Sequence, residues 1–154
     1  LPYRIYMQQG FLSESGDNFV DYHDCYKWFT DLVEQYQIYP LQIGYDRYSA
    51  QYLIQDMKNY GFHMDDVYQG ENLTPVIQEF EGTLKDGNVR IGTNNLLKAH
   101  LLDSAVKLNA ETNRRKLIKL SPHAHIDGTA CLLDAFCVAQ KWHSEIGEQL
   151  KNED

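Results

Sequence analysis

The sequence predicts an α/β fold in one compact domain. Amphipathic helical segments alternate along the chain with short extended segments, which is the order typical of layered α/β domains. The length of 154 residues fits one such domain. No repeat with a period of 20–50 residues occurs, so a solenoid is not expected. We expect the domain to span residues 1–144, followed by a polar tail over residues 145–154.

The first half of the chain predicts two helices and two strands. Residues 1–20 have a mixed composition, with turn signals at Gly10 and at residues 15–18. Apolar residues spaced by three and four positions predict a helix over 22–36. Asp21 precedes this helix and is a suitable cap, because its carboxylate accepts hydrogen bonds from unpaired backbone N–H groups. The other elements expected here are a strand over 41–46, a helix over 49–59 that ends at Gly61, and a weaker strand over 63–68.

The second half predicts three helices and one strand. Thr74 and Pro75 mark the start of the third helix, because proline is tolerated in the first turn. Gly87 ends that helix. Four apolar residues that share one helical face predict a fourth helix over 96–108. The remaining expected elements are a brief extended segment at 89–91, a strand at 117–120 and a last helix that Asp127 caps and that runs through Trp142.

The composition excludes some classes of function. The chain has 14 Lys and Arg residues against 22 Asp and Glu residues, a formal net charge of −8. Nucleic acids are bound through Lys and Arg clusters, so any DNA contact here requires a local basic patch. No apolar run approaches the roughly 20 residues of a membrane-spanning helix, and no secretory signal opens the chain. We therefore expect no membrane partner and a cytoplasmic location.

Several common site types lack support. The three cysteines include no C-x-x-C pair, which argues against a disulfide framework and a thiolate zinc site. The six histidines include no H-E-x-x-H motif, and no phosphate-binding P-loop is present. No G-x-S-x-G nucleophile elbow occurs either.

Two aspartates stand out by their positions. Asp46 closes a predicted strand, where α/β sheets place their ligands, and Asp127 opens a predicted helix. Carboxylates that converge in this way suit Mg²⁺ or Mn²⁺, which prefer oxygen ligands. The alternative is that Asp46 is a turn residue and Asp127 only a helix cap. Asp134 lies in an apolar run and needs a partner if buried, either as an acceptor behind the metal ligands or in a salt bridge.

One stretch of the chain is basic. Residues 107–125 contain five Lys and Arg residues and one Glu, a local net charge of +4, and lead directly into Asp127. A basic ribbon beside a carboxylate site suits a phosphate-bearing polymer. The alternative is a solvated turn between a helix and a strand. The residues expected to contact DNA are Arg115, Lys116 and Lys119 in this ribbon, and Arg47 beside Asp46.

Short motifs recur along almost the whole chain in a characteristic order. They are Gln9-Gly10-Phe11-Leu12, Gly16-Asp17-Asn18-Phe19-Val20-Asp21-Tyr22, Ile43-Gly44-Tyr45-Asp46-Arg47, Gln69-Gly70, Lys119 and Ile126-Asp127-Gly128, with Ala135 downstream. Each motif alone is short, but together they resemble the C-terminal nuclease domain of the tailed-phage terminase large subunit. The most similar group is the one related to phage HK97 and to prophage terminases.

The resemblance implies an RNase H-like nuclease fold, with helices packed on a small mixed sheet. It implies an endonuclease that cuts concatemeric double-stranded DNA during genome packaging, in the cytoplasm of the bacterial host. Asp46 and Asp127 would be catalytic and would hold Mg²⁺ or Mn²⁺ in a two-metal site. The implied partners are DNA, the terminase small subunit and the portal protein. ATP would be used only by a motor domain, whose motifs this sequence lacks.

One departure from the family qualifies these expectations. Relatives carry a further Asp on the first strand of the nuclease sheet, and nothing in residues 1–20 matches that strand. We therefore expect the sequence to correspond to the later part of the nuclease domain, without its first strands and inactive by itself. Two alternatives stay open: a noncatalytic α/β protein-interaction module, and another RNase H-like nuclease such as a resolvase or transposase.

Overall fold

The computed structural model describes the backbone of residues 2–152, and the side chains of all of these except 146, 149, 150 and 152. The chain divides into two compact units, which we call unit 1 (Leu1–Ser13 and Tyr68–Cys137) and unit 2 (Glu14–Val67 and Val138–Asp154). The elements in chain order are α1 (Tyr3–Gln8), α2 (Tyr22–Tyr36), β1 (Ile43–Asp46), α3 (Gln51–Tyr60), β2 (Met64–Val67), the 3₁₀ helix η1 (Glu71–Leu73), α4 (Thr74–Lys85), α5 (Asn95–Leu102), β3 (Ser104–Leu108), β4 (Arg115–Lys119) and α6 (Asp127–Asn152).

Unit 2 is built on a βαβ arrangement. Strands β1 and β2 pair in parallel, from Ile43 opposite Met64 to Asp46 opposite Val67, and α3 connects them. Parallel strands need such a crossover, and a helix supplies it. Helix α3 ends at Gly61, whose φ of +117° is costly for residues with a side chain.

Helix α2 begins and ends where the sequence predicts. The Asp21 carboxylate accepts a hydrogen bond of 2.9 Å from the His23 backbone N–H, so the predicted cap is confirmed. The core of unit 2 joins α2 to α3 through buried apolar side chains, while six further apolar residues pack around them. The buried members are Val33, Met57 and Phe62, and those around them are Tyr26, Phe29, Ile43, Leu53, Tyr60 and Met64.

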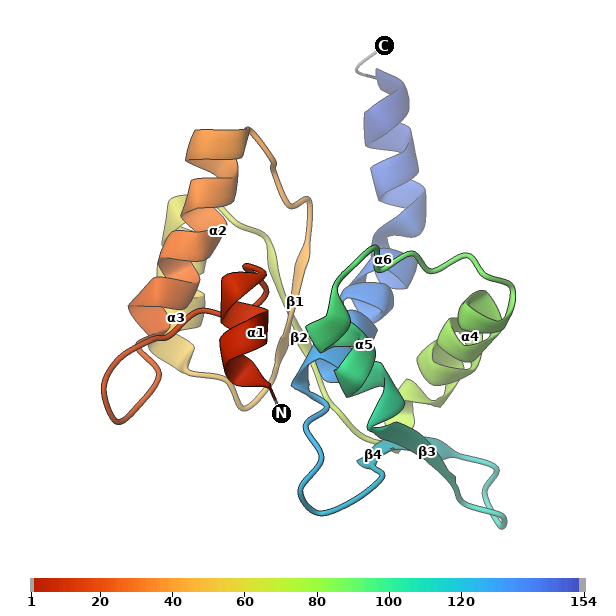
Figure 1. Ribbon diagram of the computed structural model, residues 1–154. Helices are drawn as coiled ribbons and strands as arrows, with labels where there is room; N and C mark the ends of the chain where they lie inside the picture. The colour runs from red at the N-terminus through yellow and green to blue at the C-terminus, as the bar shows by residue number, and fades with distance from the viewer. Residues whose placement is uncertain (1, 153–154) are drawn as a thin grey trace. The chain divides into compact units, whose positions relative to one another are not determined.

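Unit 1 combines α1, η1, α4, α5, a β3–β4 hairpin and the first turns of α6. The hairpin projects from this unit (Figure 1). The Thr74 hydroxyl at the start of α4 accepts the Arg115 backbone N–H at 2.8 Å, which anchors the base of β4. The buried apolar residues of this unit are Tyr6, Leu73, Val76, Ile77, Phe80, Ala124 and Leu133.

The prediction of a helix over 96–108 was wrong for its last six residues. Helix α5 ends at Leu102, and Ser104–Leu108 forms β3, antiparallel to β4. The apolar spacing in this stretch fits both a helical face and an alternating strand. The deciding contacts are non-local, because β4 provides backbone partners for every residue of β3. Tertiary pairing of this kind overrides weak local propensity.

Three further features differ from the expected outline. Helix α1 was not expected within residues 1–20, and α6 continues ten residues beyond Trp142. Parallel and antiparallel pairings both occur, in two separate two-stranded sheets among the described residues. The division into a domain over 1–144 and a polar tail over 145–154 stays a prediction.

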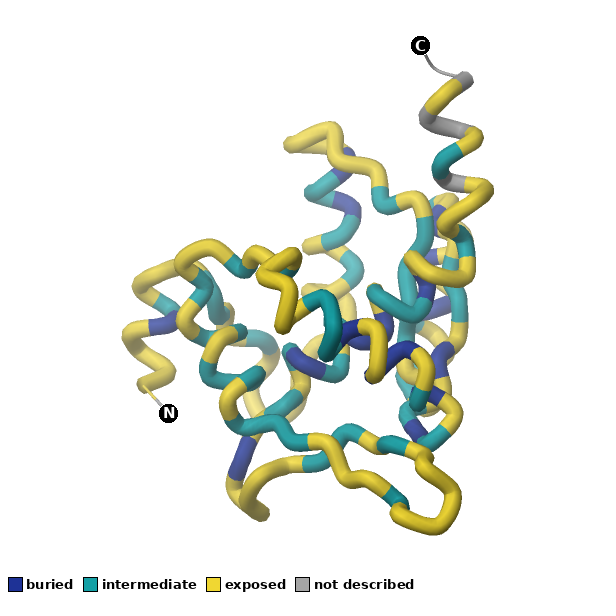
Figure 2. Tube along the Cα trace, turned by 90° about the vertical axis from the view of Figure 1, so that its right-hand side faces the viewer, coloured by how far each residue is buried: buried dark blue, intermediate teal, exposed yellow. Residues whose placement is uncertain are grey.

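Burial follows the pattern of amphipathic elements. Buried positions occur singly or in pairs along the described chain (Figure 2), as expected of helices that bury one stripe. None of the described helices is both long and apolar enough to cross a membrane.

Candidate functional site

Asp46 lies at the carboxyl end of β1 in unit 2 and is exposed. Its Oδ1 accepts a hydrogen bond of 3.0 Å from the Tyr48 backbone N–H, which turns the chain after the strand. Within the described part of the chain, no hydrogen bond or ion pair engages Oδ2. Asp46 is therefore a turn residue that still presents a carboxylate oxygen to solvent.

Arg47 forms an ion pair beside this carboxylate. Its Nε and Nη2 both donate to Asp66 Oδ2, at 3.1 and 3.0 Å, and both side chains are about half exposed. Burial raises the pKa of the neighbouring Tyr45 hydroxyl, and the charges of Asp66 and Asp65 raise it further. The Tyr45 phenol is therefore neutral at physiological pH. The ion pair with Asp66 offsets part of the positive charge of Arg47.

Asp127 is the exposed first residue of α6, in unit 1. The contact that caps this end comes from another helix: the Gly128 N–H donates to His100 Nδ1 of α5 at 2.9 Å. A Cβ built on Gly128 would lie 2.9 Å from that nitrogen and 3.0 Å from Leu97 Cδ1. Gly128 therefore allows the close approach of α5 that places the imidazole over the helix terminus. The sequence contained no signal for this role of His100.

Asp134 is buried in unit 1, with 6% of its surface exposed. One of its carboxylate oxygens accepts a short hydrogen bond from Gln69 Nε2, and the same nitrogen contacts the Ala130 carbonyl oxygen at 3.3 Å. A buried carboxylate requires a hydrogen-bonding partner, and the side-chain amide of Gln69 is one for Asp134. Gln69 belongs to the Gln69-Gly70 motif of the sequence, for which no role was predicted. The structure shows that its side chain binds Asp134.

The basic ribbon is the β3–β4 hairpin. Lys107 and Lys116 face each other across the two strands, and both are exposed. Lys119 is exposed at the other end of β4. Arg115 differs, because its Nη1 donates to Glu81 Oε2 at 2.6 Å and its side chain is only 27% exposed. Most of the positive charge of the hairpin is therefore available to an anionic ligand.

The donor chemistry of the two candidate ligands fits a hard divalent cation, since both are exposed carboxylates with oxygen atoms open to solvent. Among the described residues, no group of three or more His, Cys, Asp or Glu side chains is gathered for a metal ion. Asp46 belongs to unit 2 and Asp127 to unit 1, so their approach to each other stays a prediction.

A family described as the terminase large subunit, endonuclease domain, matches residues 3–143. No curated protein matches the sequence. The fold resembles the large terminase of bacteriophage HK97, with a TM-score of 0.74 and 21% identity over 88% of this chain and 28% of that one. It also resembles the large terminase nuclease from thermophilic phage G20c, with a TM-score of 0.60 and 14% identity over 79% of this chain and 64% of that one.

At these identities the two solved structures establish the fold. The mixed α/β architecture is that of terminase nuclease domains, which have an RNase H-like fold, so the fold expected from the sequence motifs is confirmed. The chain spans less than two thirds of either structure. The family match covers nearly the whole chain, and the chain therefore belongs to the terminase large subunit endonuclease domain family.

Proposed function

We propose that this chain serves a DNA-packaging terminase of a phage or prophage as its nuclease, cutting concatemeric double-stranded DNA with the help of Mg²⁺ or Mn²⁺. The observation that carries the proposal is the family match over residues 3–143. It favours a terminase nuclease over another RNase H-like nuclease such as a resolvase or transposase. Packaging takes place in the bacterial cytoplasm, with the terminase small subunit and the portal protein as partners and ATP consumed by a motor domain.

Asp46 and Asp127 are the proposed metal ligands and catalytic residues. Their positions support this assignment, because Asp46 ends β1, Asp127 begins α6 and both carboxylates are exposed. Both side chains would supply carboxylate oxygens, the ligands that Mg²⁺ and Mn²⁺ prefer. A divalent ion held by these residues would stabilise the charge that develops on a phosphodiester and would lower the pKa of bound water. Asp134, held by Gln69, orients the first turns of α6 behind Asp127.

The β3–β4 hairpin is the proposed DNA-binding element. Lys116 and Lys119 are exposed on β4, so they are free to contact phosphates without first breaking a buried interaction. Arg115 and Arg47 would contribute less, because Glu81 and Asp66 already hold their guanidinium groups. Contacts of this kind position the duplex and carry no sequence preference.

Binding of Mn²⁺, followed by electron paramagnetic resonance of the free ion, tests the metal site without requiring activity. Asp46→Asn and Asp127→Asn should each weaken binding about tenfold or more, because each removes a charged oxygen ligand. Asp56→Asn, an exposed carboxylate on α3, is the matched control and should bind like the unmodified chain. Unchanged binding in both site variants would refute the shared site and favour the noncatalytic interaction module.

A further inference from the structure

A cavity of about 520 Å³ opens in unit 2, at the end of its sheet opposite to Asp46. Residues 39–42, which lead into β1, and residues 61–63, which lead into β2, form much of its wall. Because β1 and β2 run in parallel, both of these segments lie at the amino-terminal edge of the sheet. Asp46 ends β1 at the other edge, so this cavity is separate from the candidate catalytic carboxylate.

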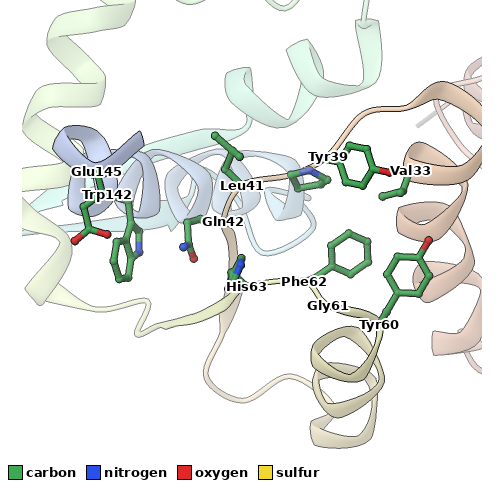
Figure 3. A pocket seen from close by; sticks show the side chains of 11 residues that line it. Val33, Tyr39, Leu41, Gln42, Tyr60, Gly61, Phe62, His63, Trp142 and Glu145 are labelled. Carbon is green, nitrogen blue, oxygen red and sulfur yellow. The ribbon is translucent and has the colours of Figure 1, made fainter. Parts of the chain in front are cut away.

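Aromatic side chains lie at both ends of the cavity. Figure 3 shows Trp142 and Glu145 of α6 together at one end, and Tyr60 and Phe62 at the other. Between these ends the wall contains both apolar and hydrogen-bonding side chains. The remaining lining residues are Val33, Tyr39, Pro40, Leu41, Gln42, Gly61 and His63.

Contacts with neighbouring side chains hold the aromatic rings of the cavity in place. Tyr60 stacks on Phe62 with ring centroids 5.0 Å apart, and its hydroxyl donates to Glu34 Oε1 at 3.1 Å. Trp142 Nε1 donates to Asp65 Oδ2 at 2.8 Å. Side chains held in this way lose little conformational entropy when a ligand binds, so the cavity is preorganised.

The acidic charge of unit 2 as a whole, together with Glu145 in the lining, favours a cationic ligand. By sequence, unit 2 contains 14 Asp and Glu residues and 5 Lys and Arg residues. Glu145 lines the cavity itself, and the Lys141 ammonium lies 5.3 Å from the centroid of the Trp142 ring. That internal contact is a cation–π interaction, so this indole already attracts a cation from its own chain. A polyanion such as DNA is repelled by the same charge.

We propose that this cavity binds an arginine-bearing segment of a partner protein. The guanidinium would stack on Trp142 and pair with Glu145, because its planar fork suits both an aromatic face and a carboxylate. An apolar side chain of the same segment would occupy the end lined by Phe62. Gln42 and His63 lie between the two ends and offer hydrogen-bonding groups to the backbone of the segment.

The test uses the 154-residue chain and the peptide acetyl-Leu-Gly-Gly-Arg-amide, followed by the NMR shift of the Gly61 amide. A second peptide carries citrulline, a neutral isostere of arginine. The arginine peptide should bind saturably in the millimolar range, and the citrulline peptide about tenfold more weakly, as expected when a cation–π contact and an ion pair are lost. Neither DNA nor a metal ion is present, so failure here is distinct from failure of the proposed nuclease function.

Matched variants locate the binding. Glu145→Gln and Trp142→Leu should each weaken binding of the arginine peptide about five- to tenfold. Glu148→Gln removes a charge from the same helix outside the cavity and should change binding less than twofold. Equal affinity for both peptides, or no saturable shift up to about 10 mM, would overturn the proposal. Concentration-dependent dimerisation that shifts Gly61 without peptide would assign the cavity to a second copy of this chain instead.

Discussion

At the scale of single residues, the start of α6 depends on a glycine, Gly128, whose lack of a side chain lets α5 approach. A Cβ at Gly128 would meet the His100 ring, and the Gly128 N–H donates the hydrogen bond that His100 accepts. The imidazole accepts at Nδ1, so this geometry requires the neutral ring with its proton on Nε2. The orientation of Asp127 is therefore tied to α5 through the residue that follows it.

Gly128→Ala should destabilise the protein by about 1–3 kcal/mol, because the new methyl group overpacks the contact between the two helices. The measurement is urea denaturation followed by circular dichroism. Gly82→Ala is the control in the same unit: it lies within α4 with nothing within 4 Å of a built Cβ. That substitution should stabilise by up to about 1 kcal/mol through helix propensity. A loss of stability at Gly82 as large as that at Gly128 would contradict this account.

At the scale of elements, one carboxylate joins β2 to α6 within unit 2. Asp65 accepts hydrogen bonds of 2.9 Å from Lys141 Nζ and 2.8 Å from Trp142 Nε1, and its side chain is 14% exposed. Burial by itself raises the pKa of this carboxyl, but the hydrogen bonds and the Lys141 charge outweigh burial and hold the pKa below its ordinary value of 3.8. The charged form therefore stabilises the folded state.

Asp65→Asn should destabilise the protein by about 1–3 kcal/mol near pH 7, since a charge-assisted hydrogen bond is lost. A lowered folded-state pKa contributes stability above the ordinary pKa of 3.8 and loses it as the pH falls through the folded value. The difference in melting temperature between the two proteins should therefore shrink below about pH 4. Thermal scans from pH 3 to 7 check this, with Asp56→Asn as the control. A constant difference across that range would exclude the titration of Asp65 as the cause.

The β3–β4 hairpin combines a structural cost with a proposed function. Lys107 and Lys116 are directly opposite each other, and like charges in that position destabilise a strand pair. Lys116→Gln should therefore stabilise the fold by about 0.2–1 kcal/mol while weakening DNA binding. The slope of the logarithm of the binding constant against the logarithm of salt concentration should become shallower by about one, as expected when one phosphate contact is lost.

Fluorescence anisotropy with duplex DNA at several salt concentrations measures that slope. Lys58→Gln, a basic residue of α3 in unit 2, should leave it unchanged. If Lys116→Gln changed neither stability nor the salt slope, the hairpin would be a solvated loop and DNA would have to bind elsewhere.

At the scale of the whole molecule, charge is unevenly divided between the units. By sequence, unit 1 has 9 Lys and Arg residues against 8 Asp and Glu residues, whereas most of the acidic excess belongs to unit 2. A duplex attracted by positive charge should therefore contact the hairpin of unit 1. The carboxylates proposed for the metal, Asp46 and Asp127, come one from each unit.

Residues 1–154 by themselves should show little or no cleavage of plasmid DNA with Mn²⁺. A two-metal site needs several carboxylates, and this proposal supplies two ligands, Asp46 and Asp127, which is too few to hold both ions. Conversion of supercoiled plasmid to linear DNA on agarose gels provides the readout. Strong cutting by residues 1–154 that Asp46→Ala abolishes would show that these two carboxylates suffice and would contradict this prediction.

The sequence by itself determined the elements whose signals are local. The cap at Asp21, the apolar stripe of α2, the stop at Gly61 and the carboxylate at the end of β1 depend on residues within a few positions of each other, so they were predictable. Family motifs in a fixed order then identified the fold that these elements build.

Only the tertiary structure decided the features that need distant partners. Residues 104–108 became a strand because β4 pairs with them, although their spacing also suits a helix. The contacts of His100 with Gly128, of Gln69 with Asp134 and of Asp65 with Trp142 join residues 28 to 77 positions apart. No local pattern encodes such contacts, because they arise only when packing of the core brings the elements together.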